Sequence, residues 1–311
     1  MVLEPNEMRN IFIIIVTYKG QRWYDRCFGS LRKSTVPVKA IVIDNASNDG
    51  SVEYIKEHYP EIHLIESKEN LGFGRANNIG MRYAFDNGCD YVFLLNQDAW
   101  IERDTLQRLI EIHQRHPEYG ILGPVQVNSE KTKVLNGVIQ FLINPDNVNK
   151  DLFSDLLMGK TGEIYPVAEI NAAAWLLPRK TLEIVGGFDP IFLHYGEDWN
   201  YLSRVLYHGM KVGLTPDLKV VHDCSDHVEQ PIGYEMGFDK WLLQRAADIL
   251  YHDTQVDDMI QHYRRTAFLK LLSFHKDTFK ENWLAFQYLK NNRERIRSSR
   301  EHNKVKGPNW L

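Results

Sequence analysis

The stretch Tyr91–Asp98 places three polar residues directly after an apolar run. Residues 92–95 are all apolar, which is typical of a strand buried on both faces of a parallel sheet. Asn96, Gln97 and Asp98 follow at the carboxyl end, where open α/β sheets bind ligands. Because strand residues alternate between faces, residues 96 and 98 would point the same way. An amide oxygen and a carboxylate suit a hard divalent cation that holds a diphosphate, and an ordinary polar turn is the alternative.

Polar clusters follow two other predicted strands at the same topological position. The apolar run Ile11–Val16 and the segment Lys39–Asp44 both read as strands of a parallel sheet. Parallel strands end on one edge of a sheet, so the clusters would gather in a single crevice. Turn chemistry explains each cluster alone, but it does not explain their recurrence at strand ends. The polar residues at these two ends are Thr17, Tyr18, Asp44, Asn45 and Ser47.

The glycines do not have the spacing of a dinucleotide-binding or P-loop enzyme. No Gly-x-Gly-x-x-Gly follows the first strand, and the pair Gly72 and Gly74 comes only after the third. No Gly-Lys-Ser/Thr sequence occurs, so a Walker phosphate loop is absent. A dehydrogenase and a P-loop NTPase are therefore both disfavoured.

Two further acidic residues and a histidine could take part in chemistry. Glu197 and Asp198 stand where the apolar spacing predicts that a helix begins. Acidic residues stabilise helix N-termini without any function, and the functional alternative is a general base aimed into the crevice. His222 ends a short predicted strand, Lys219–Asp223, but it is one of 12 histidines.

Strands that alternate with helical segments predict an α/β fold, a doubly wound sheet with right-handed crossovers. Further along the chain, Val167–Leu177 is expected to form one strand, with Trp175 more typical of core than of a sugar platform. The segment 144–162 is polar and rich in turn residues, which favours a flexible loop or insertion. The other expected elements are helices near 23–34, 51–59 and 104–116, a helix that the stretch Asn70–Gly80 leads into and that reaches about residue 87, a weak strand over 63–66 and an extended segment over 120–127.

The last third of the chain changes to long helices. Residues 257–273 and 277–297 are the clearest of these, which divides the chain into a catalytic domain over 1–225 and a helical extension over 226–311. The tail from Lys290 to Lys306 holds seven Lys/Arg against two Glu. It is expected to be solvated and partly disordered, or else to contact anionic lipid at the inner face of a membrane.

Bulk properties exclude several classes of protein. A net charge of −4 argues against a nucleic-acid partner. Three scattered cysteines form neither a disulfide framework nor a metal-ligand pattern, which favours a cytoplasmic location. The longest apolar run, Ile11–Val16, is far shorter than the roughly 18 residues that a membrane span requires.

As an ordered set, the motifs resemble glycosyltransferase family 2, the inverting transferases with a GT-A fold. Within that family the chain is most similar to the rhamnosyltransferase-like branch. The resemblance covers residues 10–225 and implies a GT-A type, mostly parallel sheet with a nucleotide-binding half. The motifs that carry it are Val16–Tyr18, Asp44–Ser51, Asn70–Asn78, Leu95–Asp98, Gly186–Asp189 and Gly196–Asp198.

The resemblance implies a role for individual residues. Asp98 would be the main metal ligand, His222 a second metal or diphosphate contact, and Asp198 the catalytic base. Asn96 replaces the first acid of the family's Asp-x-Asp motif, which removes one charge from the metal site. The donor would be bound by Thr17, Tyr18, Asp44, Asn45, Ser47, Gly72, Arg75, Asn77, Asn96 and Gln97. The acceptor would be contacted by Trp175, His194, Tyr195 and Glu197.

The function implied is transfer of a sugar, with rhamnose as a candidate, from a nucleotide-diphosphate donor to a hydroxyl of a glycan or lipid-linked acceptor. Mg²⁺ or Mn²⁺ would assist. Two alternatives remain open from the residues alone: a sugar-nucleotide nucleotidyltransferase, and a non-catalytic partner that binds nucleotides or glycans. The sequence identifies neither the oligomeric state, nor the nucleotide base, nor the linkage formed.

Overall fold

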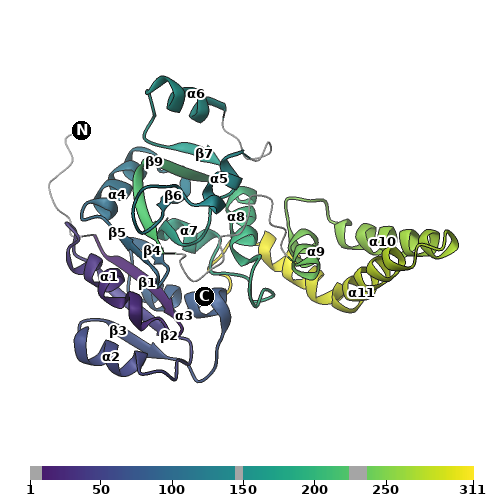
Figure 1. Cartoon of the computed structure of the whole chain (residues 1–311), viewed down its shortest axis with the longest axis horizontal. Helices are drawn as coiled ribbons and strands as arrows, with labels where there is room; N and C mark the ends of the chain where they lie inside the picture. Colours follow the sequence, from purple (N-terminus) through teal and green to yellow (C-terminus); the bar gives the residue numbers. More distant parts are fainter. Residues whose placement is uncertain (1–8, 144–149, 224–236) are drawn as a thin grey trace.

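The computed structural model describes residues 9–143, 150–223 and 237–311, and a sheet forms the centre of this part of the chain (Figure 1). Its strand order is β3-β2-β1-β4-β8-β6-β9-β5, and β7 pairs with β9 beside this path. The strands are β1 (Ile11–Thr17), β2 (Lys39–Asp44), β3 (His63–Glu66), β4 (Tyr91–Leu95), β5 (Ala99–Ile101), β6 (Tyr119–Val127), β7 (Tyr165–Val167), β8 (Ala174–Pro178) and β9 (Lys211–His222).

The first half of the sheet is parallel, as the alternation of strands and helices predicted. β1 pairs in parallel with β2 and β4, and β2 pairs in parallel with β3. The connecting helices are α1 (Gln21–Arg32), α2 (Ser51–His58) and α3 (Gly72–Asp86). Residues 11–15 of β1 are all buried, and successive residues contribute to the cores on opposite faces. The continuous apolar run of β1 is therefore explained by helices on both sides.

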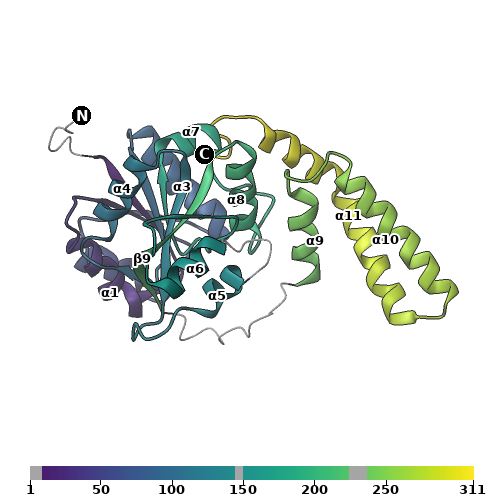
Figure 2. The ribbon, with the colours of Figure 1, turned by 90° about the horizontal axis from the view of Figure 1, so that it is seen from above.

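Helices cover both faces of the sheet (Figures 1 and 2). Residues of α3, α7 (Arg179–Ile184) and α8 (Glu197–Tyr207) pack in one core cluster, and residues of α1, α2 and α4 (Thr105–Arg115) pack in the other. This layered arrangement confirms the predicted α/β class.

The second half of the sheet is mixed. β8 is antiparallel to β4 and β6, β9 is parallel to β6, and β5 and β7 are antiparallel to β9. The prediction of one strand over Val167–Leu177 was wrong, because β7 ends at Val167 and β8 begins at Ala174. The two strands pair with different neighbours, so the chain must leave the sheet between them.

The segment 144–162 was predicted to be a flexible loop or an insertion, and a loop is wrong for residues 150–158. Residues 150–158 form α6 (Lys150–Met158), which follows α5 (Asn136–Ile143), while residues 144–149 lie outside the described ranges. Leu152 is buried in the core, and Tyr165 donates a 2.6 Å hydrogen bond to Asp155. One apolar anchor and one polar contact thus hold a helix whose composition alone is typical of a loop.

The C-terminal region is helical, as predicted, and comprises α9 (Phe238–Ala247), α10 (Gln255–Leu272) and α11 (Lys276–Lys304). α10 and α11 form a hairpin that projects away from the sheet (Figures 1 and 2). The expected boundary between the two parts, near residue 225, lies outside the described residues. None of the described helices combines the length and hydrophobicity that a membrane span requires.

The prediction of a solvated, partly disordered tail over 290–306 was wrong. α11 runs to Lys304, and Ser299, Arg300 and Asn303 are buried. Arg300 donates to backbone carbonyls at the end of α9 and beyond, including that of His252 at 2.8 Å. Arg300 is therefore used in helix packing and is not available to bind lipid, as the alternative prediction for the segment 290–306 would require.

Candidate active site

The polar clusters predicted from the sequence meet at the carboxyl ends of β1, β2 and β4. Thr17 at the end of β1 lies opposite Asp44 at the end of β2, and β4 runs beside β1. A cavity of about 480 Å³ opens at this edge. Its lining residues are Val16, Tyr18, Asn45, Asn70, Gly72, Phe73, Asn96, Gln97, Asp98, Leu193 and His194. Five of the ten residues expected to bind the donor line it, namely Tyr18, Asn45, Gly72, Asn96 and Gln97.

Gln97 connects the ends of β1 and β4. Its Oε1 accepts hydrogen bonds from Thr17 Oγ1 at 2.7 Å and from the backbone N–H of Tyr18 at 3.0 Å. A Cβ atom on Gly20 would lie 2.0 Å from this Oε1, so a larger residue there would displace the Gln97 side chain. Thr17 is fully buried and also bonds Tyr24 at 2.5 Å. Thr17 therefore positions the cavity wall and offers no exposed group to a nucleotide.

Asn96 and Asp98 lie on the other side of this turn, next to His222. Asp98 Oδ1 is 3.3 Å from His222 Nε2, and the Asn96 amide lies 3.4 Å from the same nitrogen. The antiparallel pairing of β5 with β9 sets Ala99 opposite His222 and so explains the contact. The resemblance singled out His222, and the fold brings it to Asp98 from more than a hundred residues away.

Gln126 holds the His222 ring, and the sequence reasoning missed it. Its Oε1 lies 3.1 Å from His222 Nδ1, while its amide donates to the carbonyl of Asn171 at 3.2 Å. An amide oxygen only accepts, so this contact favours a proton on Nδ1 of His222. A buried glutamine within the apolar strand β6 was the available signal, but only the neighbouring strand β9 reveals its partner.

The donor set around Asp98 suits a cation shared between protein and ligand. Among the described residues, no group of three His, Cys, Asp or Glu side chains is arranged to hold a metal. Asp98 and His222 supply one carboxylate and one imidazole, and Asn96 adds an amide. Mg²⁺ and Mn²⁺ prefer about six ligands that are mostly oxygen, so a diphosphate and water would have to complete the sphere. The residues present therefore fit a metal–diphosphate complex better than a metal alone.

Asp44 and its neighbours form the part of the site nearest β2. Asp44 is 2% exposed, and its Oδ2 accepts from the backbone N–H of Ser47 at 2.9 Å. Its other oxygen, Oδ1, is buried and has no hydrogen-bond partner among the described residues. Ser47 in turn accepts from the backbone N–H of Lys19 at 2.9 Å. A buried carboxylate oxygen without a partner is costly, and a donor group of a ligand would satisfy it.

A loop that precedes α8 closes over the start of α3. Gly72 has a left-handed backbone (φ +77°), and a Cβ atom there would lie 2.1 Å from the carbonyl oxygen of Leu193. The expected acceptor residue His194 lines the cavity, whereas Tyr195 is exposed and lies under Lys240. Burial, together with the charge of Lys240, lowers the pKa of His194. Residues 193 and 194 of this loop thus form one wall of the cavity.

Glu197 and Asp198 form the first turn of α8. Asp198 is half-buried, lies outside the lining of the cavity and accepts from the backbone N–H of Trp199 at 2.8 Å. Burial raises the pKa of Asp198, and the backbone N–H groups of Trp199 and Asp198 partly oppose this. Burial and then the charge of Asp198 raise the pKa of Glu197 to about 7. Glu197 therefore titrates near neutral pH, and the charge of its neighbour Asp198 contributes to this shift.

Three residues expected at the site lie elsewhere. Trp175 is fully buried and stacks on Phe188 with ring centroids 6.3 Å apart, so its expected acceptor role was wrong and the core role holds. Asn77 is 1% exposed and bonds the carbonyl of Phe73 within α3, so it cannot touch a donor. Arg75 is exposed and donates to the carbonyl of Pro190 at 2.9 Å, which ties α3 to the loop before α8.

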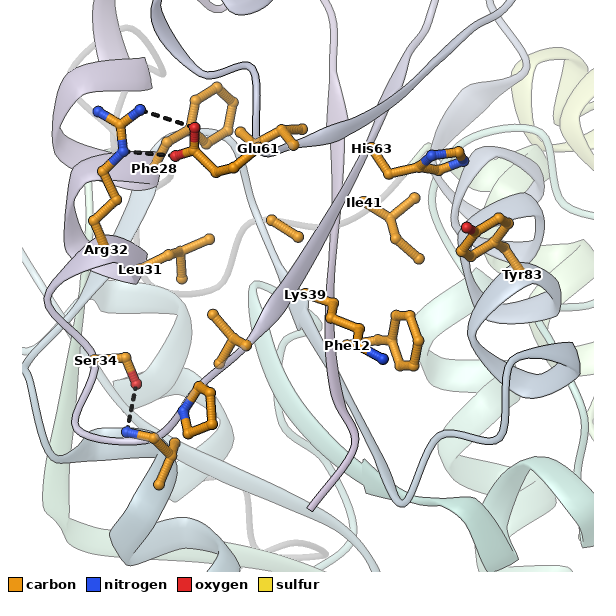
Figure 3. Close-up of a pocket in the computed structure, with 15 residues that line it drawn as sticks. Phe12, Phe28, Leu31, Arg32, Ser34, Lys39, Ile41, Glu61, His63 and Tyr83 are labelled. Atoms are coloured by element: carbon orange, nitrogen blue, oxygen red, sulfur yellow. Dashed lines mark hydrogen bonds and ion pairs between the residues drawn. The ribbon is translucent and has the colours of Figure 1, made fainter. Parts of the chain in front are cut away.

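A second cavity, also of about 480 Å³, opens at the opposite edge of the sheet (Figure 3). It is lined by the amino ends of β1, β2 and β3, including Phe12, Lys39 and His63, and its lining is mostly apolar. Arg32 and Glu61 form an ion pair at its rim with N–O 2.6 Å. The polar strand ends all lie at the other edge, so the first cavity is the candidate active site.

Comparison with known proteins agrees with this fold and site. Residues 12–167 match the family described as glycosyl transferase family 2, and the chain belongs to that family. It is therefore a glycosyltransferase, and the nucleotidyltransferase and non-catalytic alternatives lose their support.

Relatives of this chain include rhamnosyltransferases. The chain is 24% identical over 220 residues to a dTDP-rhamnosyl transferase of Shigella flexneri, which covers 70% of each chain. It is 25% identical over 231 residues to an N-acetylglucosaminyl-diphospho-decaprenol L-rhamnosyltransferase of Mycobacterium tuberculosis, covering 68% of this chain and 75% of that one. These similarities place the chain with the rhamnosyltransferase-like members of the family.

Two solved structures share the fold of this chain. The S. aureus protein TarS in complex with UDP-GlcNAc superposes with a TM-score of 0.56 at 14% identity, covering 95% of this chain and 90% of that one. A mannosyltransferase from Pyrobaculum calidifontis, solved with GDP-Man and Mn²⁺, gives a TM-score of 0.50 at 17% identity, covering 96% and 75%. At these identities the likeness establishes the fold alone.

Proposed function

We propose that the protein is an inverting glycosyltransferase that moves a sugar from a nucleotide-diphosphate donor to a hydroxyl group. The observation that carries the proposal is the meeting of Asn96, Asp98 and His222 beside a cavity that is also lined by Asn45, next to Asp44 at the end of β2. The end with Asp98 suits a diphosphate with a divalent cation. The end with Asp44 suits a nucleobase that has N–H donors.

The relatives support a rhamnosyl donor and a lipid-linked acceptor. One is named for dTDP-rhamnose, and another for an acceptor that is a diphospho-decaprenol. The two structural neighbours carry UDP-GlcNAc and GDP-Man, so the fold accepts more than one nucleotide and sugar. We therefore propose a deoxythymidine-diphosphate sugar, with rhamnose as the first candidate.

The general base for catalysis in this proposal is Asp198. Its carboxylate takes the proton of the acceptor hydroxyl as that oxygen attacks the anomeric carbon, and the bond from that carbon to the diphosphate oxygen breaks. A single displacement inverts the anomeric configuration. The loop over 193–195 would screen the reacting atoms from water.

When bound, Mn²⁺ or Mg²⁺ would offset the charge that grows on the leaving diphosphate. Asp98 and His222 would hold it, with Asn96 beside them. Loss of one acid at residue 96 reduces the charge of the site, and His222 favours Mn²⁺ over the harder Mg²⁺. In the same proposal residues 1–225 form the catalytic domain, and the helices of 226–311 are an extension whose end braces it.

Donor hydrolysis and product stereochemistry test the proposal. A panel of nucleotide sugars is incubated with the full chain and Mn²⁺ without acceptor, and release of nucleotide diphosphate is measured. We expect slow hydrolysis of one donor, and, with a prenyl-diphospho-sugar acceptor, a product whose anomeric configuration by NMR is opposite to that of the donor. Retention of configuration, or no hydrolysis and no transfer with any donor, would refute it.

A further inference from the structure

The end of the α10–α11 hairpin carries large apolar side chains that the described chain leaves exposed. We define the hairpin tip as residues 264–284, which contain the last turns of α10 and the first turns of α11. Phe274, in the turn between the helices, is 88% exposed. Each of the following tip residues is at least 40% exposed: Phe268, Leu269, Leu271, Leu272, Phe274, Trp283 and Leu284. Monomeric soluble surfaces rarely gather so many large apolar groups in one place.

The seam between the two helices does not use these large side chains. At this end of the hairpin, the residues buried between α10 and α11 are the small Ala267 and Ala285, each 1% exposed. Small residues let the helix backbones approach closely, which turns the phenylalanines and leucines outward. The apolar surface is therefore built into the sequence of both helices and does not arise from one frayed end.

The charge of the hairpin tip is opposite to that of the whole protein. The tip holds five Lys/Arg and two acids, whereas the chain has a net charge of −4. Lys276 and Lys280 are exposed on the first turns of α11, beside Phe274. Exposed apolar side chains framed by basic ones are the combination that binds the interface of an anionic membrane.

The hairpin projects from the body of the protein, and its tip is the most distant part of it (Figures 1 and 2). α10 alone has 18 residues, which corresponds to about 27 Å of helix. A planar surface can therefore reach the hairpin tip without covering the cavity at the carboxyl ends of β1 and β4.

We propose that the hairpin tip docks on anionic membrane, with its apolar side chains in the headgroup region and its lysines and arginines on the lipid phosphates. This site differs from the basic segment 290–306, part of whose charge is used in packing. A second copy of the chain is the competing occupant, but a symmetric pairing of tips would bring like charges together. The docking is independent of the reaction proposed for the cavity, although it would hold the enzyme at the surface where a lipid-linked acceptor resides.

The test is flotation of the full chain with vesicles of phosphatidylglycerol and phosphatidylcholine, against vesicles of phosphatidylcholine alone. We expect binding to the anionic vesicles that weakens with salt. The double variant Leu272→Glu/Phe274→Glu should lose it, and Lys276→Glu/Lys280→Glu should weaken it roughly tenfold or more. Matched controls are Leu157→Glu, at an 87% exposed leucine of α6, and Lys33→Glu/Lys160→Glu, at exposed lysines elsewhere. These should bind like the wild type.

Thermal unfolding and donor hydrolysis of the tip variants distinguish a loss of membrane binding from a loss of folding or activity. Thermal unfolding of the tip variants should match that of the wild type, because the changed side chains are exposed, and donor hydrolysis should be unchanged. Loss of binding without loss of hydrolysis supports the proposal and leaves the proposed reaction untouched. Absence of vesicle binding, or binding that the tip variants retain, would overturn it. The proposal would also be overturned if the wild type sediments as a dimer without lipid and the tip variants sediment as monomers.

Discussion

Asn303 near the end of α11 donates a 2.7 Å hydrogen bond to the Asp189 carboxylate, 114 residues earlier in the chain. Ser299 bonds the same carboxylate oxygen at 2.5 Å, and the other oxygen accepts from the backbone N–H of Ile191 at 2.9 Å. Asp189 belongs to the turn before the loop over 193–195, so the C-terminal helix fixes the wall of the candidate active site. The helical extension is therefore a structural part of that site.

Replacement of Asp189 by Ala should destabilise the protein and loosen the loop. The change leaves the side chains of Ser299 and Asn303 buried without their acceptor, which should cost roughly 2–4 kcal/mol of unfolding free energy. Asn303→Ala should cost about 1–2 kcal/mol, and chemical denaturation measures both. Asn292→Ala is the matched control, since that amide bonds only the carbonyl of Tyr288 within α11. Equal stability of all three variants would show that the bracing contact contributes nothing.

Removal of the base should affect turnover and not donor binding. Asp198→Asn keeps the size of the side chain and its acceptor for the Trp199 N–H, but it cannot take a proton. We expect turnover to fall roughly 100-fold or more at nearly unchanged donor affinity. Because burial raises the pKa of Asp198, the acidic limb of the wild-type rate profile should lie above 3.8, the ordinary value for an aspartate. Asp239→Asn, at an exposed acid in the first turn of α9, is the control. Near-normal turnover in Asp198→Asn would remove this residue from the role.

The metal-binding assignment predicts a dependence on Asp98 and His222. Asp98→Ala and His222→Ala should each weaken nucleotide-diphosphate binding in the presence of Mn²⁺ by roughly 10-fold or more, and should change it little when a chelator is present. Isothermal titration calorimetry with and without Mn²⁺ measures the difference. Gln126→Leu should give a smaller loss of the same kind, because it frees the His222 ring without removing a ligand. An affinity that is the same with and without Mn²⁺ would count against the assignment.

The raised pKa of Glu197 predicts a pH-dependent stability. The folded carboxyl has a pKa of about 7 and the unfolded one about 4.5, so the folded state retains a proton that the unfolded state has lost. The associated stability is fully present below about pH 4.5 and is lost as the pH rises through 7. Glu197→Gln removes this titration. At about pH 8 it should be more stable than the wild type by up to roughly 3 kcal/mol. Thermal unfolding at about pH 5 and pH 8 tests this, and parallel pH profiles for the two proteins would contradict it.

Close packing at Gly72 predicts a loss of donor binding from a single methyl group. Gly72→Ala would place Cβ against the carbonyl oxygen of Leu193 and so displace the loop that lines the cavity. Gly50 is the matched control, because it has a similar backbone (φ +87°) but nothing within 4 Å of the place that a Cβ atom would take. Both variants should lose about 1–2 kcal/mol of stability from the left-handed conformation, measured by denaturation. Only Gly72→Ala should weaken donor binding, and an equal effect in both would attribute it to backbone strain.

The parallel half of the sheet and the place of the site were predictable because they depend on local patterns. Short apolar runs such as Ile11–Val16 favour buried strands, and a polar residue at the end of a strand lies at the edge of the sheet. That logic brought Asn96 and Asp98 to the correct edge. Asn77 belongs to the motif Asn70–Asn78 but is buried, because a motif does not say which face a side chain occupies.

The sequence by itself determined the fold class, the crevice and the family, because strand periodicity and polar strand ends act over a few residues. Only the tertiary structure decided which distant groups meet: His222 with Asp98, Gln126 behind the histidine, and α11 against Asp189. These contacts depend on strand order and on the return of the last helix, which no local pattern encodes. The same packing buries Ser299, Arg300 and Asn303 of the basic segment 290–306 and leaves the apolar hairpin tip exposed.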